Sequence, residues 1–379
     1  MIKAAYLHIP FCEHICHYCD FNKVFLKGQP VDEYLQALDQ EMVMTLKEFP
    51  TSTLDTIFVG GGTPTSLNEQ QLYRFCESIN RNLPKSDKLE FTFEANPGDL
   101  SKEKLQILRS AGVNRLSLGV QTFNEELLKK IGRVHKAKDV YDTIENAKQA
   151  GFENISIDLI FSLPTQTVDD FKTTLIEAFS LDIPHYSGYS LIIEPKTVFY
   201  NLLKKGKLLT PGEDLEAKMY DILMEEMDKH GFNQYEISNF SLPGYESKHN
   251  LTYWNNEHYY GLGAGAHSYL NGLRRSNSGP LKKYIDQINN GKLPIFENHQ
   301  VTKAEQMEEE MFLGLRKTKG VSISHFYEKF GLNPLTLFEK ELHDLMDKQW
   351  IEVKKDNIYL TKKGRFLGNE VFQAFLGVG

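Results

Sequence analysis

Short apolar segments alternate with longer amphipathic segments along the first two hundred residues. Each apolar segment is rich in β-branched or aromatic residues and ends at Gly, Pro or a polar residue, as buried strands do. The predicted strands lie at residues 4–9, 55–59, 90–94, 115–120, 154–161 and 185–192. Between them, apolar residues recur with the period of a helix. The predicted helices lie at residues 32–48, 68–81, 102–111, 138–150 and 167–181.

This strict alternation of strand and helix predicts an α/β fold. Right-handed crossovers between successive strands place them parallel, in a sheet or a barrel. Because the alternation weakens after about residue 195, we predict a partial (βα)6 barrel of the TIM type rather than a closed barrel of eight units. In this architecture reactive side chains gather beyond the carboxyl ends of the strands, and each motif can be tested against that rule.

The rest of the chain has a different character. Residues 196–300 are irregular and rich in Asn, Gly and Tyr, with one clear helix at 214–230. Beyond them the pattern predicts short helices, a β-hairpin at 350–360 and a last helix at 363–375, typical of a winged helix. We therefore predict three domains. They are a barrel core at 1–195, an irregular aromatic-rich extension at 196–300, and a winged-helix-like appendage at 301–379.

Composition and charge exclude several classes of protein. Hydrophobic residues make up 41% and charged residues 25% of the chain, which excludes a disordered or membrane-spanning protein. The net charge is −8, and residues 301–379 carry equal numbers of basic and acidic side chains, so we expect no nucleic-acid partner. The amino-terminal segment has no cleavable apolar region. We expect a cytoplasmic protein without stable membrane insertion.

Three of the four cysteines lie close together. Cys12, Cys16 and Cys19 come after the first predicted strand with C-x3-C-x2-C spacing, whereas Cys76 stands alone on a predicted helix as a small buried hydrophobe. Three thiolates from one loop favour an iron–sulfur cluster with one open iron. The alternatives are zinc with His14 or His17 as a fourth ligand, for which no second knuckle is evident, and three inert buried thiols.

Other polar and glycine residues fall where barrel chemistry is expected. The run Gly60-Gly61-Gly62-Thr63-Pro64-Thr65 comes after the second strand, lacks the Lys of a phosphate loop, and can either approach a ligand closely or form a tight turn. Glu94, Gln121 and Asp158 lie near strand ends, and Arg133 comes after the fourth strand. Such side chains can hold ribose hydroxyls, an ammonium or a carboxylate, although each alone is equally typical of a strand-end hydrogen bond.

A further histidine lies among aromatic residues in the irregular region. His249 belongs to the run Lys248-His249-Asn250-Leu251-Thr252-Tyr253-Trp254, and the glycine-rich segment 261–268 comes after it. Such a histidine can be an axial ligand of haem iron, with the glycines admitting a flat ligand. The alternative is a hydrogen-bonded histidine beside an aromatic core cluster.

The cysteine triplet resembles the signature of the radical S-adenosylmethionine (SAM) superfamily. Together with the segments 6–12, 60–65, 93–97 and 118–121, it is similar to the oxygen-independent coproporphyrinogen III dehydrogenase group over essentially the whole chain. The resemblance implies a 4Fe–4S cluster on Cys12, Cys16 and Cys19, whose open iron binds SAM and splits it into a 5′-deoxyadenosyl radical. The residues that it implies as SAM contacts are Tyr6, Gly61, Gly62, Thr63, Glu94, Gln121, Arg133 and Asp158.

Two departures from the dehydrogenase pattern indicate a particular branch. Phe21 stands where the dehydrogenases carry a further cysteine, and the first strand begins almost at Met1, where they have an amino-terminal extension. Both features resemble the HemW-type haem chaperones, whose haem-binding motif is similar to the segment around His249. The implied function is haem delivery to respiratory haem proteins. The alternatives are an oxygen-independent coproporphyrinogen III oxidase and a zinc-stabilised binding protein.

That function also implies particular partners. They are haem as cargo, haem-accepting respiratory proteins and an electron donor to the cluster. Whether the chain is an enzyme stays open, because the cofactor residues are present and the additional cysteine is not. A homodimer is one option that the sequence does not decide.

Overall fold

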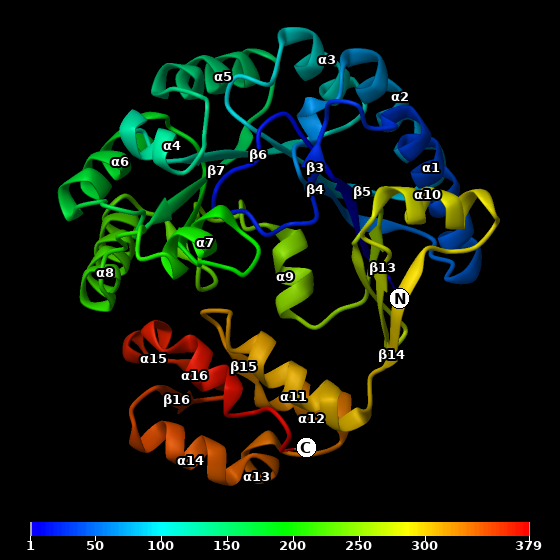
Figure 1. Ribbon diagram of the computed structural model, residues 1–379. Coiled ribbons are helices and arrows are strands. Elements are labelled where there is room, and N and C mark those ends of the chain that lie inside the picture. Colours follow the sequence, from blue (N-terminus) through cyan, green and yellow to red (C-terminus); the bar gives the residue numbers. More distant parts are fainter. Residues whose placement is uncertain (1, 379) are drawn as a thin grey trace.

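Six parallel strands form the centre of the structure, a computed structural model that describes residues 2–378 (Figure 1). They lie side by side in chain order within a larger sheet of 12 strands. Their bounds are β1 Ala4–Ile9, β4 Leu54–Gly61, β5 Lys85–Ala95, β6 Arg115–Gln121, β7 Asn154–Phe161 and β8 His185–Ser190. The predicted partial barrel of six βα units is confirmed. The largest difference is at β5, which begins five residues before its predicted start.

The helices that connect the strands cover the outer side of the curved sheet (Figure 1). Each begins and ends within one residue of its predicted bounds. They are α1 Val31–Glu48, α2 Glu69–Asn82, α3 Lys102–Ser110, α5 Ala137–Gln149 and α6 Val168–Ser180. Side-chain caps explain the agreement at several amino-terminal ends. Asn68 and Thr167 each accept a hydrogen bond from a backbone N–H of the first turn and complete capping boxes on α2 and α6.

Short elements in the βα loops were not predicted. The chain forms a two-stranded pair after β1, a 3-10 turn after β4 and a short helix after β6. These are β2 Phe11–Cys12 with β3 Val24–Phe25, η1 Pro64–Ser66 and α4 Glu125–Lys130. All three lie on the side of the barrel where the parallel strands end.

The prediction that residues 196–300 are irregular apart from one helix is wrong. The predicted helix is α8 Glu213–Lys229, but further strands extend both edges of the sheet. These are β9 Asn233–Gln234, β10 Asn239–Ser241, β11 Tyr259–Leu262, β12 His267–Leu270, β13 Leu273–Asn277 and β14 Ile295–Gln300. The remaining helices are α7 Val198–Lys204, α9 Lys248–Trp254 and α10 Leu281–Asn289. The strands have two to six residues and form by pairing with an existing edge, so the local pattern gives little sign of them.

The carboxyl-terminal segment packs around a hydrophobic cluster of its own that includes Met311, Phe326, Phe338, Ile358 and Phe375. Its elements are α11 Lys303–Gly314, β15 Val321–Ser322, α12 Ile323–Phe330, α13 Pro334–Leu337, α14 Glu339–Asp347, β16 Ile351–Lys354, β17 Asn357–Leu360, α15 Lys362–Phe366 and α16 Gly368–Gln373. The hairpin at 350–360 is confirmed. The last helix is instead two short ones. The division into three domains stays a prediction.

None of the helices in the described part of the chain combines the length and apolar character that crossing a bilayer requires.

Replacing Phe93 by Ala should destabilise the barrel by about 3–5 kcal/mol, because its fully buried ring on β5 packs against Phe75 and Phe91 and its loss leaves a cavity. Phe296→Ala is the matched control, since that ring is 63% exposed and its removal should change stability by less than about 0.5 kcal/mol. Denaturant titration followed by circular dichroism measures both. Equal unfolding midpoints for the two variants would contradict this assignment of the core.

Candidate functional site

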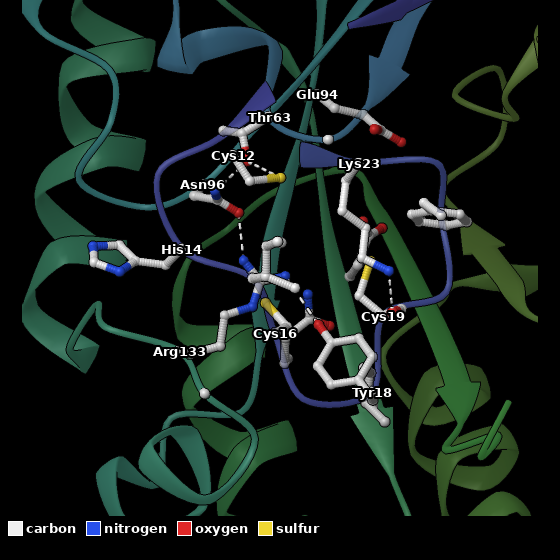
Figure 2. Close-up of a pocket in the computed structure, with 18 of the residues that line it drawn as sticks. Cys12, His14, Cys16, Tyr18, Cys19, Lys23, Thr63, Glu94, Asn96 and Arg133 are labelled. Atoms are coloured by element: carbon white, nitrogen blue, oxygen red, sulfur yellow. Dashed lines mark hydrogen bonds between the residues drawn. The ribbon is translucent and has the colours of Figure 1, made fainter. Parts of the chain in front are cut away.

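A cavity of about 440 Å³ opens at the carboxyl ends of the parallel strands, within the range of about 300–1,000 Å³ that is usual for small-molecule sites. Loops after five different strands contribute to it, and Figure 2 shows their side chains converging. Ten of the twelve predicted site residues line it: Cys12, Cys16, Cys19, Gly61, Gly62, Thr63, Glu94, Gln121, Arg133 and Asp158. The expectation that the motifs meet at this end of the barrel therefore holds.

The cysteine loop is fixed to the barrel at both ends and in its middle. Its start and end pair with each other as β2 and β3. His17 fixes the middle of the loop to the barrel. Its backbone N–H donates to Ile131 O at 2.9 Å, and its Nδ1 lies 2.9 Å from Lys130 O. His17 is thus engaged in holding the loop, which leaves it poorly placed to serve as a fourth zinc ligand.

The three thiols of the loop are free of disulfide bonds. Cys12 is buried, and burial raises the pKa of its thiol to about 11, while the pKa of Cys19 is raised by burial as well. A thiol in such surroundings stays protonated at neutral pH unless a positive ion compensates the charge of the thiolate. This donor set suits a metal centre, because a bound metal provides that compensation.

A chain of hydrogen bonds connects the first cysteine to the far wall of the cavity (Figure 2). Thr63 Oγ1 donates to Cys12 Sγ at 3.6 Å, and Asn96 Nδ2 donates to Thr63 Oγ1 at 3.1 Å. The guanidinium of Arg133 donates to Asn96 Oδ1 and, at 3.0 Å, to the hydroxyl of Tyr18. The chain therefore fixes the orientation of Arg133 toward the cavity.

Asn96 and Tyr18 are further residues of the site that the sequence pattern did not single out. Both lie inside segments that it had singled out, Asn96 two residues after Glu94 and Tyr18 directly before Cys19. Their position in the sequence was therefore a usable signal, but only the fold shows that both contact Arg133.

Packing requires glycine at Gly61, the last residue of β4, and at Gly62 directly after it. A Cβ on Gly62 would lie 2.7 Å from Phe11 O, and a Cβ on Gly61, whose φ is +112°, would lie 2.4 Å from the ring of His8. The amide N–H groups of Gly62 and Thr63 donate to backbone carbonyls of the β1–β2 segment, at 2.8 Å each. These amides hold the segment that leads into the cysteine loop. The N–H groups of Gly62 and Thr63 are therefore not free to donate to a ligand in the cavity.

Two half-buried carboxyl groups, Glu94 on β5 and Asp158 on β7, face the cavity from strands on either side of β6. Burial, with the charge of Asp158 as the next cause, raises the pKa of Glu94 to about 8, and burial likewise raises the pKa of Asp158. Gly61 N donates to Glu94 Oε2 at 3.1 Å, and Ser117 Oγ donates to Asp158 at 3.5 Å. Together with Arg133, these groups can bind a ligand that carries both a cation and a carboxylate.

Two predicted site residues, Tyr6 and His249, lie outside the cavity lining. The hydroxyl of Tyr6 lies 2.9 Å from His8 Nδ1, and its ring stacks on Phe58. Tyr6 therefore lies within the barrel and supports the cysteine loop indirectly, through His8.

His249 is buried on α9, with both of its ring nitrogens engaged. Nδ1 lies 2.8 Å from Thr56 Oγ1 and Nε2 lies 2.8 Å from the hydroxyl of Tyr253, while the ring stacks on Phe58. Burial lowers the pKa of His249 to about 3. Neither nitrogen is free to bind iron in this conformation, so the geometry matches the alternative of a histidine within an aromatic core cluster.

Comparison with known families agrees with the architecture of the site. Residues 6–178 match the Radical SAM superfamily, and residues 301–367 match the HemN C-terminal domain. A partial βα barrel with three cysteines in the loop after its first strand defines a radical SAM protein. That class implies a 4Fe–4S cluster and SAM as cofactors.

Three relatives specify the family within this class. A protein named Heme chaperone HemW from Bacillus subtilis is 59% identical over 377 residues, which are 99% of this chain and 100% of that protein. Proteins of the same name from Lactococcus lactis and Synechocystis are 48% and 37% identical, and the alignments cover 97% and 87% of their lengths and 99% and 93% of this chain. The chain belongs to the HemW family.

A solved structure supports the fold over its whole length. Coproporphyrinogen III oxidase (HemN) from Escherichia coli, described as a radical SAM enzyme, superposes with a TM-score of 0.86 over 99% of this chain and 90% of that chain. The sequence identity is 24%, so the likeness establishes the shared fold and not a shared activity.

Glu94→Gln should stabilise the ligand-free protein at pH 8–9, by about 2 kcal/mol or more, with the gain shrinking toward pH 5. In the folded protein the pKa of Glu94 lies above its ordinary value of 4.5. The carboxyl therefore binds its proton more tightly in the folded state than in the unfolded state. The wild type therefore loses stability as the pH rises from about 4.5 through about 8. Thermal unfolding at several pH values measures the effect.

The exposed Glu153→Gln is the control. Its carboxyl stays in water whether or not the chain is folded, so this change should leave the pH dependence as it is in the wild type. Parallel stability curves for wild type and Glu94→Gln would contradict a protonated Glu94.

Proposed function

We propose that this chain is a haem chaperone that carries a 4Fe–4S cluster and a SAM site and delivers haem to haem-dependent proteins. The observation that carries the proposal is the 59% identity, over the full length of both chains, with a protein named Heme chaperone HemW. At that identity the barrel, its loops and the carboxyl-terminal segment all correspond, so the whole machinery of the relative has a counterpart here.

Cys12, Cys16 and Cys19 would hold the cluster. They share one loop and one cavity, their thiols are unpaired, and burial makes a compensating positive ion favourable beside them. When bound, a cluster with three protein ligands supplies one open iron and a single electron. His14 also lines the cavity, which keeps zinc as the alternative that a metal analysis decides.

The remaining wall of the cavity suits SAM, an amino acid with a sulfonium centre. Glu94 and Asp158 offer carboxyls to its cationic groups, and Arg133, held by Asn96 and Tyr18, can fix its carboxylate. Gln121, Gly61, Gly62 and Thr63 would bound the site. Tyr6 would act indirectly, through His8 and the loop above it.

One residue at the rim argues against porphyrinogen decarboxylation. The ring of Phe21 is 62% exposed and lines the cavity, in the position where the resembled dehydrogenases carry an additional thiol. An aromatic ring can neither ligate a metal nor exchange a proton, so whatever that thiol does in a dehydrogenase has no counterpart here. Coproporphyrinogen III oxidase activity remains the second candidate because the SAM cavity is complete.

The proposal implies particular partners and a location. The haem acceptors would be respiratory haem proteins, and a reductant would supply the cluster with its electron. We place the protein in the cytoplasm, without a nucleic-acid partner. A homodimer stays a prediction.

Replacing Cys12, Cys16 or Cys19 by Ala should lower the iron content after anaerobic reconstitution from about four per chain to near zero, because each change removes one of three protein ligands. Cys76→Ala is the matched control, since this thiol is buried on α2 away from the cavity, and it should keep the wild-type iron content. Iron and zinc are both measured on the same samples. One zinc and no iron in the wild type would contradict the proposal.

The anaerobic wild-type protein should bind haem in a spectroscopic titration and leave coproporphyrinogen III unconsumed in the presence of SAM and a reductant. His249→Ala should impair haem binding only as far as it loosens the aromatic cluster, because His249 is hydrogen-bonded on both sides. Formation of protoporphyrinogen IX by the same preparation would favour the second candidate, and absence of haem binding would contradict the first.

A further inference from the structure

Asn22 occupies a slot at the carboxyl-terminal end of the cysteine loop, three residues after Cys19. Its side-chain amide donates to Ala264 O at 2.8 Å and to Gly279 O at 3.1 Å. A Cβ on Gly265 would lie only 2.6 Å from Asn22 Nδ2, and Gly265 has a φ of +76°. The residue is therefore held between two turns that lie more than 240 residues away in the sequence.

A buried carboxyl group on helix α1 also fixes the segments that carry Ala264 and Gly279. Glu41 is 1% exposed and accepts hydrogen bonds from Gly263 N at 2.7 Å, Asn277 Nδ2 at 2.6 Å and the Tyr284 hydroxyl at 2.5 Å. The bonds from Gly263 N and the Tyr284 hydroxyl satisfy buried donors, and Asn277 Nδ2 also donates to Gly263 O at 2.9 Å. The slot for Asn22 is thus part of the rigid core and not a mobile surface loop.

The backbone of Asn22 is held from the opposite side by His8 on β1. His8 Nε2 lies 2.7 Å from Asn22 O, and His8 Nδ1 lies 2.9 Å from the Tyr6 hydroxyl. Since a carbonyl can only accept, Nε2 carries the proton and the Tyr6 hydroxyl donates to Nδ1. This arrangement gives Tyr6 a part in supporting the loop.

The glycine-rich segment 261–268 has a structural explanation in these contacts. A Cβ on Gly263 would lie 2.7 Å from His8 O, and one on Gly265 would meet Asn22. These two glycines thus admit the Asn22 side chain and the backbone of β1, in place of the flat ligand that the sequence pattern predicted.

We infer that Asn22 is a positioning residue for the cluster, which holds Cys19 in place by locking the end of its loop into the slot formed by residues 263–265 and 278–279. The inference rests on the proposed ligation of the cluster by the three cysteines. Cys12 is already fixed by its strand and by Thr63, and the middle of the loop is fixed through His17.

Apart from the hydrogen bond that its own N–H donates to Cys16 O at 3.2 Å, Cys19 has its support on its carboxyl-terminal side. Lys23 donates to Cys19 O, as Figure 2 shows, and Asn22 provides the connection to the barrel core. The position of the third thiol therefore depends on the hydrogen bonds of Asn22.

Asn22→Asp tests the inference with almost no change of shape. A carboxylate cannot donate to the two carbonyl oxygens, so both side-chain hydrogen bonds are lost. The matched control is Asn290→Asp, because the exposed Asn290 amide also donates to a backbone carbonyl, that of Asp286 at 2.7 Å, at the end of α10. Asn22→Ser, which keeps one donor, is the milder second variant.

The measurement is made on full-length protein reconstituted without oxygen. Loss of iron to a coloured chelator gives the rate of cluster release, and the spectrum of the reduced cluster, with and without SAM, reports its surroundings. We expect Asn22→Asp to release iron about tenfold faster than wild type, as the loss of two buried hydrogen bonds implies. Asn22→Ser should be intermediate, and Asn290→Asp should equal wild type.

Each outcome decides the inference. Equal release rates and spectra for Asn22→Asp, Asn290→Asp and wild type would overturn it while leaving the proposed cluster intact. A wild type that takes up no iron would overturn the cluster ligation itself, and the role of Asn22 with it. If circular dichroism shows that Asn22→Asp does not fold, Asn22→Ser decides, and a wild-type rate in that folded variant would overturn the inference.

Discussion

Three thiols can share a single metal centre when the fold constrains the short loop that carries them. In this protein the constraint comes partly from the two ends of the loop, which pair with each other, and partly from the barrel. Strand β2 pairs with β3, the Gly62 and Thr63 amides hold the β1–β2 segment, and His17 holds the middle of the loop to Ile131. Because the anchors outside the loop belong to the barrel, the geometry of the site depends on the barrel as well as on the loop.

The electrostatics of the cavity result from the same burial. Glu94, Asp158 and the thiols of Cys12 and Cys19 all have raised pKa values because water is largely excluded around them. Each of these groups gains when a positive charge arrives beside it. A metal centre and a sulfonium-bearing amino acid each bring positive charge, so the energetics of the cavity favour the cofactors that the radical SAM class uses.

This chain shares its fold with the coproporphyrinogen III oxidase HemN, and features around the cavity bear on its function. Because Phe21 stands at the rim of the cavity, no further thiol is present at that position. His249 and the glycine-rich segment 261–268 pack within the protein and make structural contacts. A shared fold with HemN at 24% identity is compatible with different chemistry, because function depends on the site and not on the scaffold. The same barrel can therefore retain cofactor binding and still serve haem delivery.

The sequence by itself determined the βα units, the helix ends and ten of the residues that line the cavity. Those features follow from local periodicity, from helix caps such as Asn68 and Thr167, and from motifs at strand ends. It did not determine the strands β9–β14, the roles of Asn96, Tyr18 and Asn22, or the burial of His249. Each of these depends on contacts between segments far apart in the chain, such as Asn22 with Ala264 and His249 with Thr56. Only the tertiary structure brings such partners together, because hydrogen bonding of buried polar groups is decided by packing and leaves no period in the sequence.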